Sequence, residues 1–193
     1  LEGHEVRTPA GFGQAYRAYT EGGWSGLCAS EEHGGQALPT VASAIVGEML
    51  GGSNISFALY PRLSEGAYRC IRANATPELQ AMYGPKLASG EWTGTMCLTE
   101  AQAGTDLGLL RTKAVPDGDG AYRISGGKIF ISSGEHDLAP NIVHMVLARL
   151  PDAPAGTRGI SLFLVPKFLP DAEGRPGERN GVYCDAIEHK LGL

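Results

Sequence analysis

The chain has 193 residues, of which 42% are hydrophobic and 19% charged, and 16 Lys and Arg against 21 Asp and Glu give a formal net charge of −5. That length is enough to bury a core in one large domain or two small ones. The positive charges are spread along the chain, which argues against nucleic acid as the main partner. No apolar run approaches the ~20 residues that a membrane span needs. These features predict a soluble globular protein.

The ends and the cysteines add two expectations. The sequence starts at Leu1 without Met and stops at an apolar Leu193, so we interpret it as a piece of a longer protein. The scattered cysteines and histidines show no metal-binding spacing, so neither a zinc site nor a disulfide framework is expected. Reduced thiols fit a cytoplasmic protein. The four cysteines are Cys28, Cys70, Cys97 and Cys184.

Up to about residue 90 the apolar residues recur with helical spacing. Two adjacent apolar rows between Val41 and Leu50 predict a helix with one broad buried stripe, ended by Gly51-Gly52. Further helices are expected over residues 12–19 and 63–73. Thr76-Pro77-Glu78 is typical of a helix start, with a hydroxyl cap and a first-turn proline. Gly84-Pro85 is expected to break that last helix.

After Glu91 the apolar period changes to two, which predicts strands separated by turns. Asp117-Gly118 and Ser125-Gly126 suit tight hairpins. No helical pattern lies between the strands, so we exclude parallel crossovers and expect an antiparallel sandwich or barrel. The fold class is thus α+β, with a helical domain over 1–91 and a β domain over 92–193. The expected strands are 93–99, 109–115, 121–124, 128–131, 142–150, 159–165 and 181–187.

The segment from Met96 to Gly108 is the first candidate site. It leaves a strand and enters a loop with glycines, threonines and carboxylates, and such strand-end loops often hold ligands. From spacing alone, a β-turn with a hydroxyl-capped loop is the favoured interpretation. Residues 130–134 have the same two interpretations. His136 is interpreted as part of a solvated loop, and His144 as a hydrogen-bonded sheet histidine.

Several ordered motifs resemble the flavin-dependent acyl-CoA dehydrogenases. Residues 97–100 (Cys-Leu-Thr-Glu) and 104–106 (Gly-Thr-Asp) are similar to that family's first signature. The other matching segments, in family order, are 31–35, 76–80, 85–91, 127–132, 146–149, 159–165 and 188–192. The resemblance covers about residues 19–193, and residues 92–96 and 133–137 are most similar to the large branch that includes methylmercaptopropionyl-CoA dehydrogenases.

The resemblance implies FAD as cofactor and transfers its binding residues by motif position. Met96, Leu98 and Thr99 should line the pyrimidine side of the flavin ring, with donors toward its N1/O2 edge. Gly104 and Thr105 should reach the flavin phosphates or the CoA arm, which makes Thr105 a substrate-binding candidate as well.

A second segment should flank the flavin ring. By motif position it consists of Phe130, Ile131 and Ser132, with Ser132 donating near N5. Phe130 stands where the family commonly has Trp, and Ser132 replaces a frequent Thr but keeps the hydroxyl. Leu109 occupies a place where the family prefers a small residue, so the loop is expected to be shifted.

The implied reaction is α,β-dehydrogenation of an acyl-CoA thioester with hydride transfer to flavin N5. The implied partners are an electron-transfer flavoprotein and, in the full-length protein, the other subunits of a homodimer or homotetramer. The family takes its catalytic base from a closing helical domain, so no catalytic residue is expected here. Glu100 and Asp106 should instead bind loop N–H groups. The alternatives are an acyl-CoA oxidase, a non-catalytic acyl-CoA- or flavin-binding member, and an interaction module of the same fold.

Overall fold

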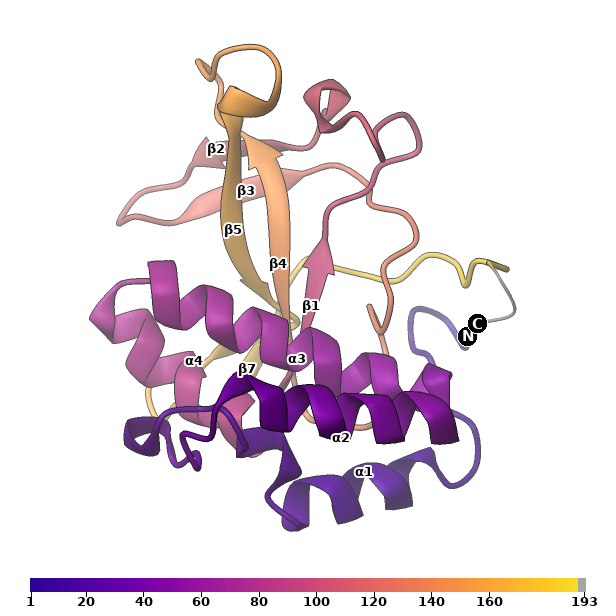
Figure 1. Cartoon of the computed structure of the whole chain (residues 1–193). Coiled ribbons are helices and arrows are strands. Elements are labelled where there is room, and N and C mark those ends of the chain that lie inside the picture. The colour runs from indigo at the N-terminus through magenta and orange to yellow at the C-terminus, as the bar shows by residue number, and fades with distance from the viewer. Residues whose placement is uncertain (191–193) are drawn as a thin grey trace.

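The first half of the chain folds into helices that lie beneath the sheet in Figure 1. The structure is a computed structural model that describes residues 1–190. Its long helices are α1 (Phe12–Glu21), α2 (Thr40–Ser53), α3 (Ile55–Asn74) and α4 (Pro77–Ser89). Thr76 caps α4 by accepting a hydrogen bond from the Leu79 N–H, which confirms the predicted start of this helix. None of the described helices is long and apolar enough to cross a membrane.

Two predictions about these helices are wrong. α4 continues through Pro85, although proline removes one helical hydrogen bond, because Tyr83, Leu87 and Ala88 around it are buried in the core. α3 starts at Ile55 rather than near residue 63, and it likewise contains a proline, Pro61. In both helices, tertiary packing outweighs the local effect of proline.

The predicted buried stripe of α2 is only half right. The row formed by Ala42, Val46 and Leu50 is half-buried. The neighbouring row is exposed, with 64% of Val41, 51% of Ile45 and 66% of Met49 accessible to solvent. No side chain of α2 is buried among the described residues. An apolar pattern fixes the preferred inner face of a helix, but not how much protein lies against it.

The second half forms a curled sheet in the order β1-β4-β2-β3, with β5 paired to β4. β4 is central: it pairs with β5 along one edge, and with β1 and then β2 along the other. A separate ribbon joins β6 to β7. The strands are β1 (Thr93–Cys97), β2 (Lys113–Pro116), β3 (Tyr122–Ser125), β4 (Ile142–Arg149), β5 (Ile160–Pro166), β6 (Phe168–Pro170) and β7 (Pro176–Arg179).

The α+β class is confirmed, but the exclusion of parallel pairing is wrong. β1 runs parallel to β4 from Thr93, opposite Ile142, to Cys97, opposite Val146. The long connection between them contains the β2–β3 hairpin, and this hairpin with its flanking loops provides the crossover without an α-helix. The sheet is therefore mixed.

Some predicted strands and turns also differ. The hairpin at Asp117-Gly118 is present, since the Asp117 N–H donates to the carbonyl of Ala121 at 2.9 Å. Ser125-Gly126 makes no hairpin, because residues 128–131 form no strand. Residues 181–187 form no strand either, and the last two residues of the matching segment 188–192 lie outside the described part.

One core joins the helices to the sheet. Trp92, between α4 and β1, has no exposed surface and packs edge-on against Tyr83 with ring centroids 5.8 Å apart. Ile71 of α3 and Val143 of β4 belong to the same buried cluster. Burial of large side chains is the main stabilising term, at roughly 1.5–3 kcal/mol each. The core thus fixes β1, and with it the segment that follows β1, against α3.

Candidate functional site

The candidate site begins where β1 ends. Residues 98–112, here called the β1–β2 loop, leave the sheet between β1 and β2, which both pair with the same edge of β4. The loop contains a short 3-10 helix, Leu107–Leu109. Met96 is 37% exposed, whereas Leu98 and Thr99 are half-buried. The side chains predicted to contact a cofactor therefore lie at the edge of the core.

A buried ionic network holds this loop. The Glu100 carboxylate accepts hydrogen bonds from the backbone N–H groups of Arg111, at 2.7 Å, and Thr112, at 3.0 Å. It also accepts from the Thr112 hydroxyl at 2.5 Å and from the Lys128 ammonium at 2.9 Å. Lys128 in turn donates to the carbonyl of Leu98 at 3.2 Å. Glu100 thus fastens both ends of the loop, as predicted for its structural role.

The protonation of Glu100 follows from these contacts. Its burial disfavours the charged form, but the hydrogen bonds from the Thr112 hydroxyl, the Arg111 N–H and Lys128 outweigh this effect and hold the pKa at about 2. The carboxylate is therefore ionised at neutral pH. An ionised carboxylate whose lone pairs are already occupied is a poor general base.

Two further groups complete the loop. Asp106 accepts a hydrogen bond from the Gly108 N–H at 2.9 Å, which confirms its predicted role in the turn. The Arg149 guanidinium, at the end of β4, donates to the backbone carbonyls of Gly108 at 2.8 Å and Leu110 at 2.9 Å. It also donates to the carbonyl of Gly156 at 2.8 Å, in the loop after β4. Arg149 thus ties the β1–β2 loop to the β4–β5 loop.

The second predicted segment lies beside the first. The Ile129 N–H donates to the carbonyl of Thr99 at 2.9 Å, so residues 129–132 start next to the end of β1. Phe130 has φ +59° and is 44% exposed. A bulky residue in the left-handed region is strained by about 1–3 kcal/mol, and such strain clusters at functional sites. The backbone here holds an aromatic ring at the surface.

Two glycines and two exposed hydroxyl side chains make the surface around these segments accessible to a ligand. A Cβ added at Gly104 would meet the Thr99 methyl group at 3.6 Å, an ordinary contact, and one added at Gly127 would meet nothing within 4 Å. Packing within the chain therefore requires neither glycine. Thr105 and Ser132 are exposed. Small residues and accessible hydroxyl donors are what a large ligand with many acceptor atoms needs.

His144 lies in β4, whereas His136 lies in the segment that leads into β4. His144 Nδ1 is 2.8 Å from the Thr95 hydroxyl oxygen, which confirms the predicted sheet role. His136 is only 1% exposed and its Nε2 is 2.9 Å from the Thr93 hydroxyl oxygen, so the prediction of a solvated loop is wrong. Burial, with a further contribution from the positive charge of Lys167, lowers the pKa of both to about 4. Both are structural and neutral at pH 7.

Sequence reasoning missed three residues that build the site: Thr112, Lys128 and Arg149. Thr112 stands out only by alternation: it is buried between exposed Arg111 and exposed Lys113, directly before β2. Lys128 is part of a recognised motif, but its partner Glu100 is distant in sequence, and single-sequence patterns do not reveal such pairs. Together these residues frame a surface with exposed hydroxyl groups and an exposed aromatic ring, carried by a residue with positive φ. Such a surface suits the binding of a ligand.

Comparisons with known proteins show the family. The family model of the acyl-CoA dehydrogenase N-terminal domain matches residues 3–91, and that of the acyl-CoA dehydrogenase middle domain matches residues 95–193. The chain therefore belongs to the acyl-CoA dehydrogenase family. Its fold, helices followed by a curled mixed sheet, is the one that these two domains share.

Individual members of the family show how similar this chain is to known dehydrogenases. The 3-methylmercaptopropionyl-CoA dehydrogenase of Ruegeria pomeroyi is 48% identical over 193 residues, which are 100% of this chain and 33% of the relative. A butyryl-CoA dehydrogenase of Syntrophomonas wolfei is 43% identical, over 97% of this chain and 31% of its own length. Glutaryl-CoA dehydrogenase from Mycobacterium smegmatis, solved in complex with FADH2, shares the fold at 23% identity with a TM-score of 0.68, over 83% of this chain and 38% of that one. The chain thus spans about a third of the length of the curated relatives.

Proposed function

We propose that the protein containing this chain is an FAD-dependent acyl-CoA dehydrogenase, which converts an acyl-CoA thioester to the 2-enoyl-CoA. Family membership supports the reaction class. One observation supports the site: the hydrogen bond from the Ile129 N–H to the carbonyl of Thr99 brings both predicted cofactor segments together, beside a loop that Glu100 holds in place. When bound, FAD supplies an acceptor for hydride at its N5 atom.

The residues at the end of β1 have a binding role in this proposal. Leu98 and Thr99 present backbone N–H groups and a hydroxyl, donors suited to the pyrimidine edge, where negative charge accumulates on reduction. Met96 provides apolar contact beside them. Gly104 and Thr105 lie on the accessible part of the loop, where a phosphate of the cofactor or the arm of the substrate can approach the backbone.

The segment after Lys128 flanks the opposite part of the ring. Phe130 offers an aromatic face, whose stacking is worth on the order of 1 kcal/mol beyond burial of area. Ile131 is the proposed apolar neighbour of the ring, and the exposed Ser132 hydroxyl is the proposed donor near N5. Since the backbone holds Phe130 in a strained conformation, this side of the site is formed before any ligand binds.

Dehydrogenation also needs a base that takes the proton from the α-carbon, while the β-carbon loses a hydride and the C–C bond becomes double. Glu100 and Asp106 already accept hydrogen bonds within the loop. A carboxylate next to a ring that gains negative charge would also oppose its reduction. We therefore assign neither as the base, and propose that a residue outside this chain provides it.

The reoxidation partner and the assembly belong to the proposal too. An electron-transfer flavoprotein is the proposed acceptor, and a homodimer or homotetramer the proposed state of the full-length protein. The division into domains at residue 91, and a cytoplasmic location, remain predictions from the sequence.

The test is turnover by the full-length protein with a panel of acyl-CoA thioesters. A dehydrogenase binds yellow oxidised flavin, and its absorbance falls when a good acyl-CoA is added without oxygen. Turnover with an artificial electron acceptor but little reaction with oxygen supports the dehydrogenase. Rapid oxygen consumption with hydrogen peroxide release would identify an oxidase instead, and bound flavin without reduction would identify a non-catalytic member.

A further inference from the structure

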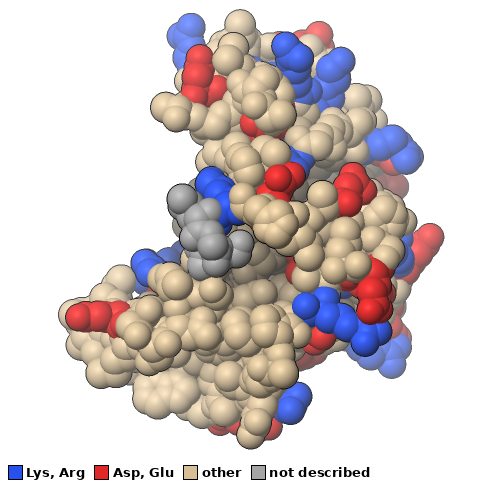
Figure 2. Space-filling view, turned by 90° about the vertical axis from the view of Figure 1, so that its right-hand side faces the viewer, with Lys and Arg blue, Asp and Glu red and all other residues tan. Residues whose placement is uncertain are grey.

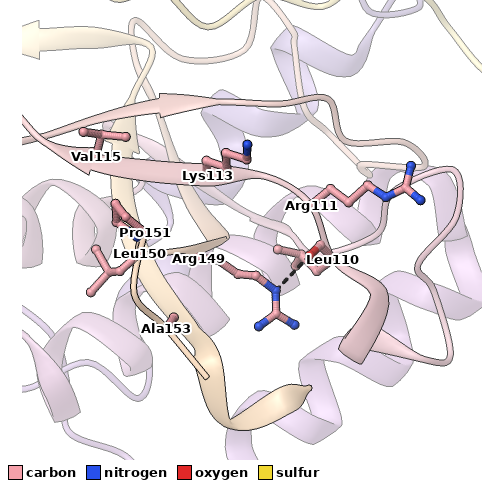
Figure 3. A pocket seen from close by; sticks show the side chains of 8 residues that line it. All are labelled: Leu110, Arg111, Lys113, Val115, Arg149, Leu150, Pro151 and Ala153. Atoms are coloured by element: carbon pink, nitrogen blue, oxygen red, sulfur yellow. Dashed lines mark hydrogen bonds between the residues drawn. The ribbon is translucent and has the colours of Figure 1, made fainter. Parts of the chain in front are cut away.

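The segment over residues 128–135 forms the second side of the candidate site, and its start is fixed. Lys128 donates to the Glu100 carboxylate, which fastens the β1–β2 loop. At the end of that loop the Arg149 guanidinium donates to the carbonyl of Leu110, beside a cleft at the end of the sheet (Figure 3). Neither anchor reaches the far end of the segment, which therefore needs an anchor of its own.

Glu135 is that second anchor. Among residues 1–190, Glu135 and Glu100 are the only buried carboxylates, at 7% and 4% exposure, whereas Figure 2 shows other acidic side chains on the outer surface. The Glu135 carboxylate forms an ion pair with Lys167, whose side chain is 13% exposed, and lies 3.7 Å from the Arg179 guanidinium. Lys167 directly precedes β6, and Arg179 ends β7. The segment is thus tied to the β6–β7 ribbon by a buried ion pair.

The residues that follow extend this anchor. The Glu135 carboxylate also accepts a hydrogen bond from the His136 N–H at 3.0 Å. The His136 ring is buried beside β1, and its centroid lies 5.2 Å from that of Tyr60 in α3. Asp137 accepts hydrogen bonds from the N–H and the hydroxyl of Thr8, at 3.1 and 2.7 Å. Three consecutive side chains therefore contact three different parts of the chain.

The backbone between the two ends of the segment is strained. Phe130 has φ +59° and Ser133 has φ +56°. The Gly134 N–H donates to the carbonyl of Ile131, and a Cβ added at Gly134 would lie only 3.3 Å from that oxygen, so the turn is tight. Residues other than glycine keep such conformations only where the surrounding structure imposes them. The buried ion pairs at both ends are the contacts that impose them here.

We propose that Glu135 is a positioning residue, which holds Phe130 and Ser132 in the conformation that the cofactor meets. The inference rests on the proposed function, in which these two residues flank the flavin ring. Glu135 acts through the backbone of residues 133 and 134. A buried ion pair fixes that backbone strictly, because separating the pair leaves two charges without partners in the interior.

The first experiment measures amide hydrogen exchange in the full-length protein without flavin. The reporters are the N–H groups of Ile129 and Gly134, which both donate to carbonyls within the site. Glu135→Gln keeps the shape of the side chain and removes its charge. Local opening then costs less, so we expect these amides to exchange at least about tenfold faster. The matched control Glu178→Gln makes the same change at an exposed position of β7 and should leave the exchange unchanged.

The second experiment asks whether Glu135 acts through Ser132. In Glu135→Gln we expect the Kd for FAD to rise about tenfold and kcat to fall about tenfold, while the KM for acyl-CoA changes less than about twofold. Ser132→Ala should lower kcat about tenfold in the parent protein. In the Glu135→Gln background it should lower kcat less than about twofold, because a hydroxyl that is no longer held in place has little left to contribute.

The proposal is overturned if exchange in Glu135→Gln equals that in Glu178→Gln, or if Ser132→Ala costs its full factor in both backgrounds. Thermal unfolding shows whether Glu135→Gln folds, and Glu135→Asp, which keeps the charge on a shorter side chain, replaces it if it does not. If Ser132→Ala has no effect in the parent protein, the proposed contact near N5 is wrong, and exchange and FAD binding decide on Glu135. Faster exchange in a protein that dehydrogenates no acyl-CoA would refute the proposed function and leave the anchor standing.

Discussion

The irregular β1–β2 loop is more firmly held by the rest of the protein than the regular helix α2. α2 is a regular helix rich in apolar residues, yet it buries none of its described side chains. The loop is mostly irregular, but Glu100 is 4% exposed and receives hydrogen bonds from backbone and side chains of residues 111, 112 and 128. A buried, fully hydrogen-bonded charge fixes a position more strictly than an apolar surface, because each lost partner leaves an unpaired group.

The largest expected effect is loss of the loop's anchor. Glu100→Ala leaves the Lys128 ammonium, whose side chain is 10% exposed, without its carboxylate, and two backbone N–H groups without an acceptor. We expect a loss of about 3–5 kcal/mol in the free energy of unfolding by urea. Glu91→Ala removes the exposed pair with Lys86 and should cost no more than ~1 kcal/mol. Equal losses in the two variants would contradict the contrast between buried and exposed pairs.

Acid should lower the free energy of unfolding through the two buried histidines. His136 and His144 have a pKa of about 4 in the folded protein, against ~6.5 when unfolded, so the unfolded state binds more protons between these values. Stability is complete above pH 6.5 and falls toward pH 4, by about 2 kcal/mol per histidine at pH 5. Urea unfolding at pH 7 and pH 5 measures this. His136→Gln and His144→Gln should each flatten the dependence, and an unchanged slope in both would refute it.

Glu100 adds a second pH dependence of the stability, at lower pH than that of the histidines. Its pKa of about 2 lies below the ordinary value of 4.5, so its contribution is present above pH 4.5 and is lost as the pH falls toward 2. Comparing Glu100→Gln with the parent protein between pH 5 and pH 3 isolates it: the two curves should converge as the pH falls. Curves that stay parallel would show that the ionised form contributes nothing.

A smaller effect is expected at the proposed flavin contact. Thr99→Val keeps the shape of the side chain and removes a hydroxyl donor, so a buried acceptor on the ligand loses about 1–3 kcal/mol. Flavin retention on dilution and the rate of flavin reduction by acyl-CoA in the full-length protein are the measurements. Unchanged flavin content together with an unchanged rate would exclude Thr99 from the site.

The smallest effect belongs to α2. Ile45→Ser alters a side chain that is 51% exposed and should change the free energy of unfolding by less than about 0.5 kcal/mol. Ile71→Ala in α3, at 2% exposure, should cost about 2–5 kcal/mol. If Ile45→Ser costs as much as Ile71→Ala, the outer face of α2 is covered in solution.

Features of the fold that depend on neighbouring residues could be predicted from the sequence. The hydroxyl of Thr76 and the Asp117-Gly118 turn act through neighbouring residues, so both were predictable. The site segments were identified through motif similarity, and Glu100 was correctly assigned to loop N–H groups, although not to Thr112 or Lys128 in particular. The roles proposed for these segments toward a cofactor remain predictions.

Three of the errors involve partners that are distant in sequence. His136 resembles a loop residue because Glu135 and Asp137 flank it, yet Thr93 and the ring of Tyr60 enclose it. The parallel pairing of β1 with β4 depends on a connection through a hairpin, which the pattern of apolar residues does not show. Continuation of α4 through Pro85 depends on the core it joins.

The most direct test of the site at the β1–β2 loop is the flavin content of two variants of the purified full-length protein, Glu100→Gln and Ile45→Ser, measured from the flavin absorbance per chain. Glu100→Gln replaces an acceptor for the Thr112 and Lys128 donors with an uncharged amide, while Ile45→Ser changes only the exposed row of α2. We expect full flavin content in Ile45→Ser and a marked loss in Glu100→Gln. Equal flavin in the two variants, both folded, would contradict the placement of the cofactor at this loop.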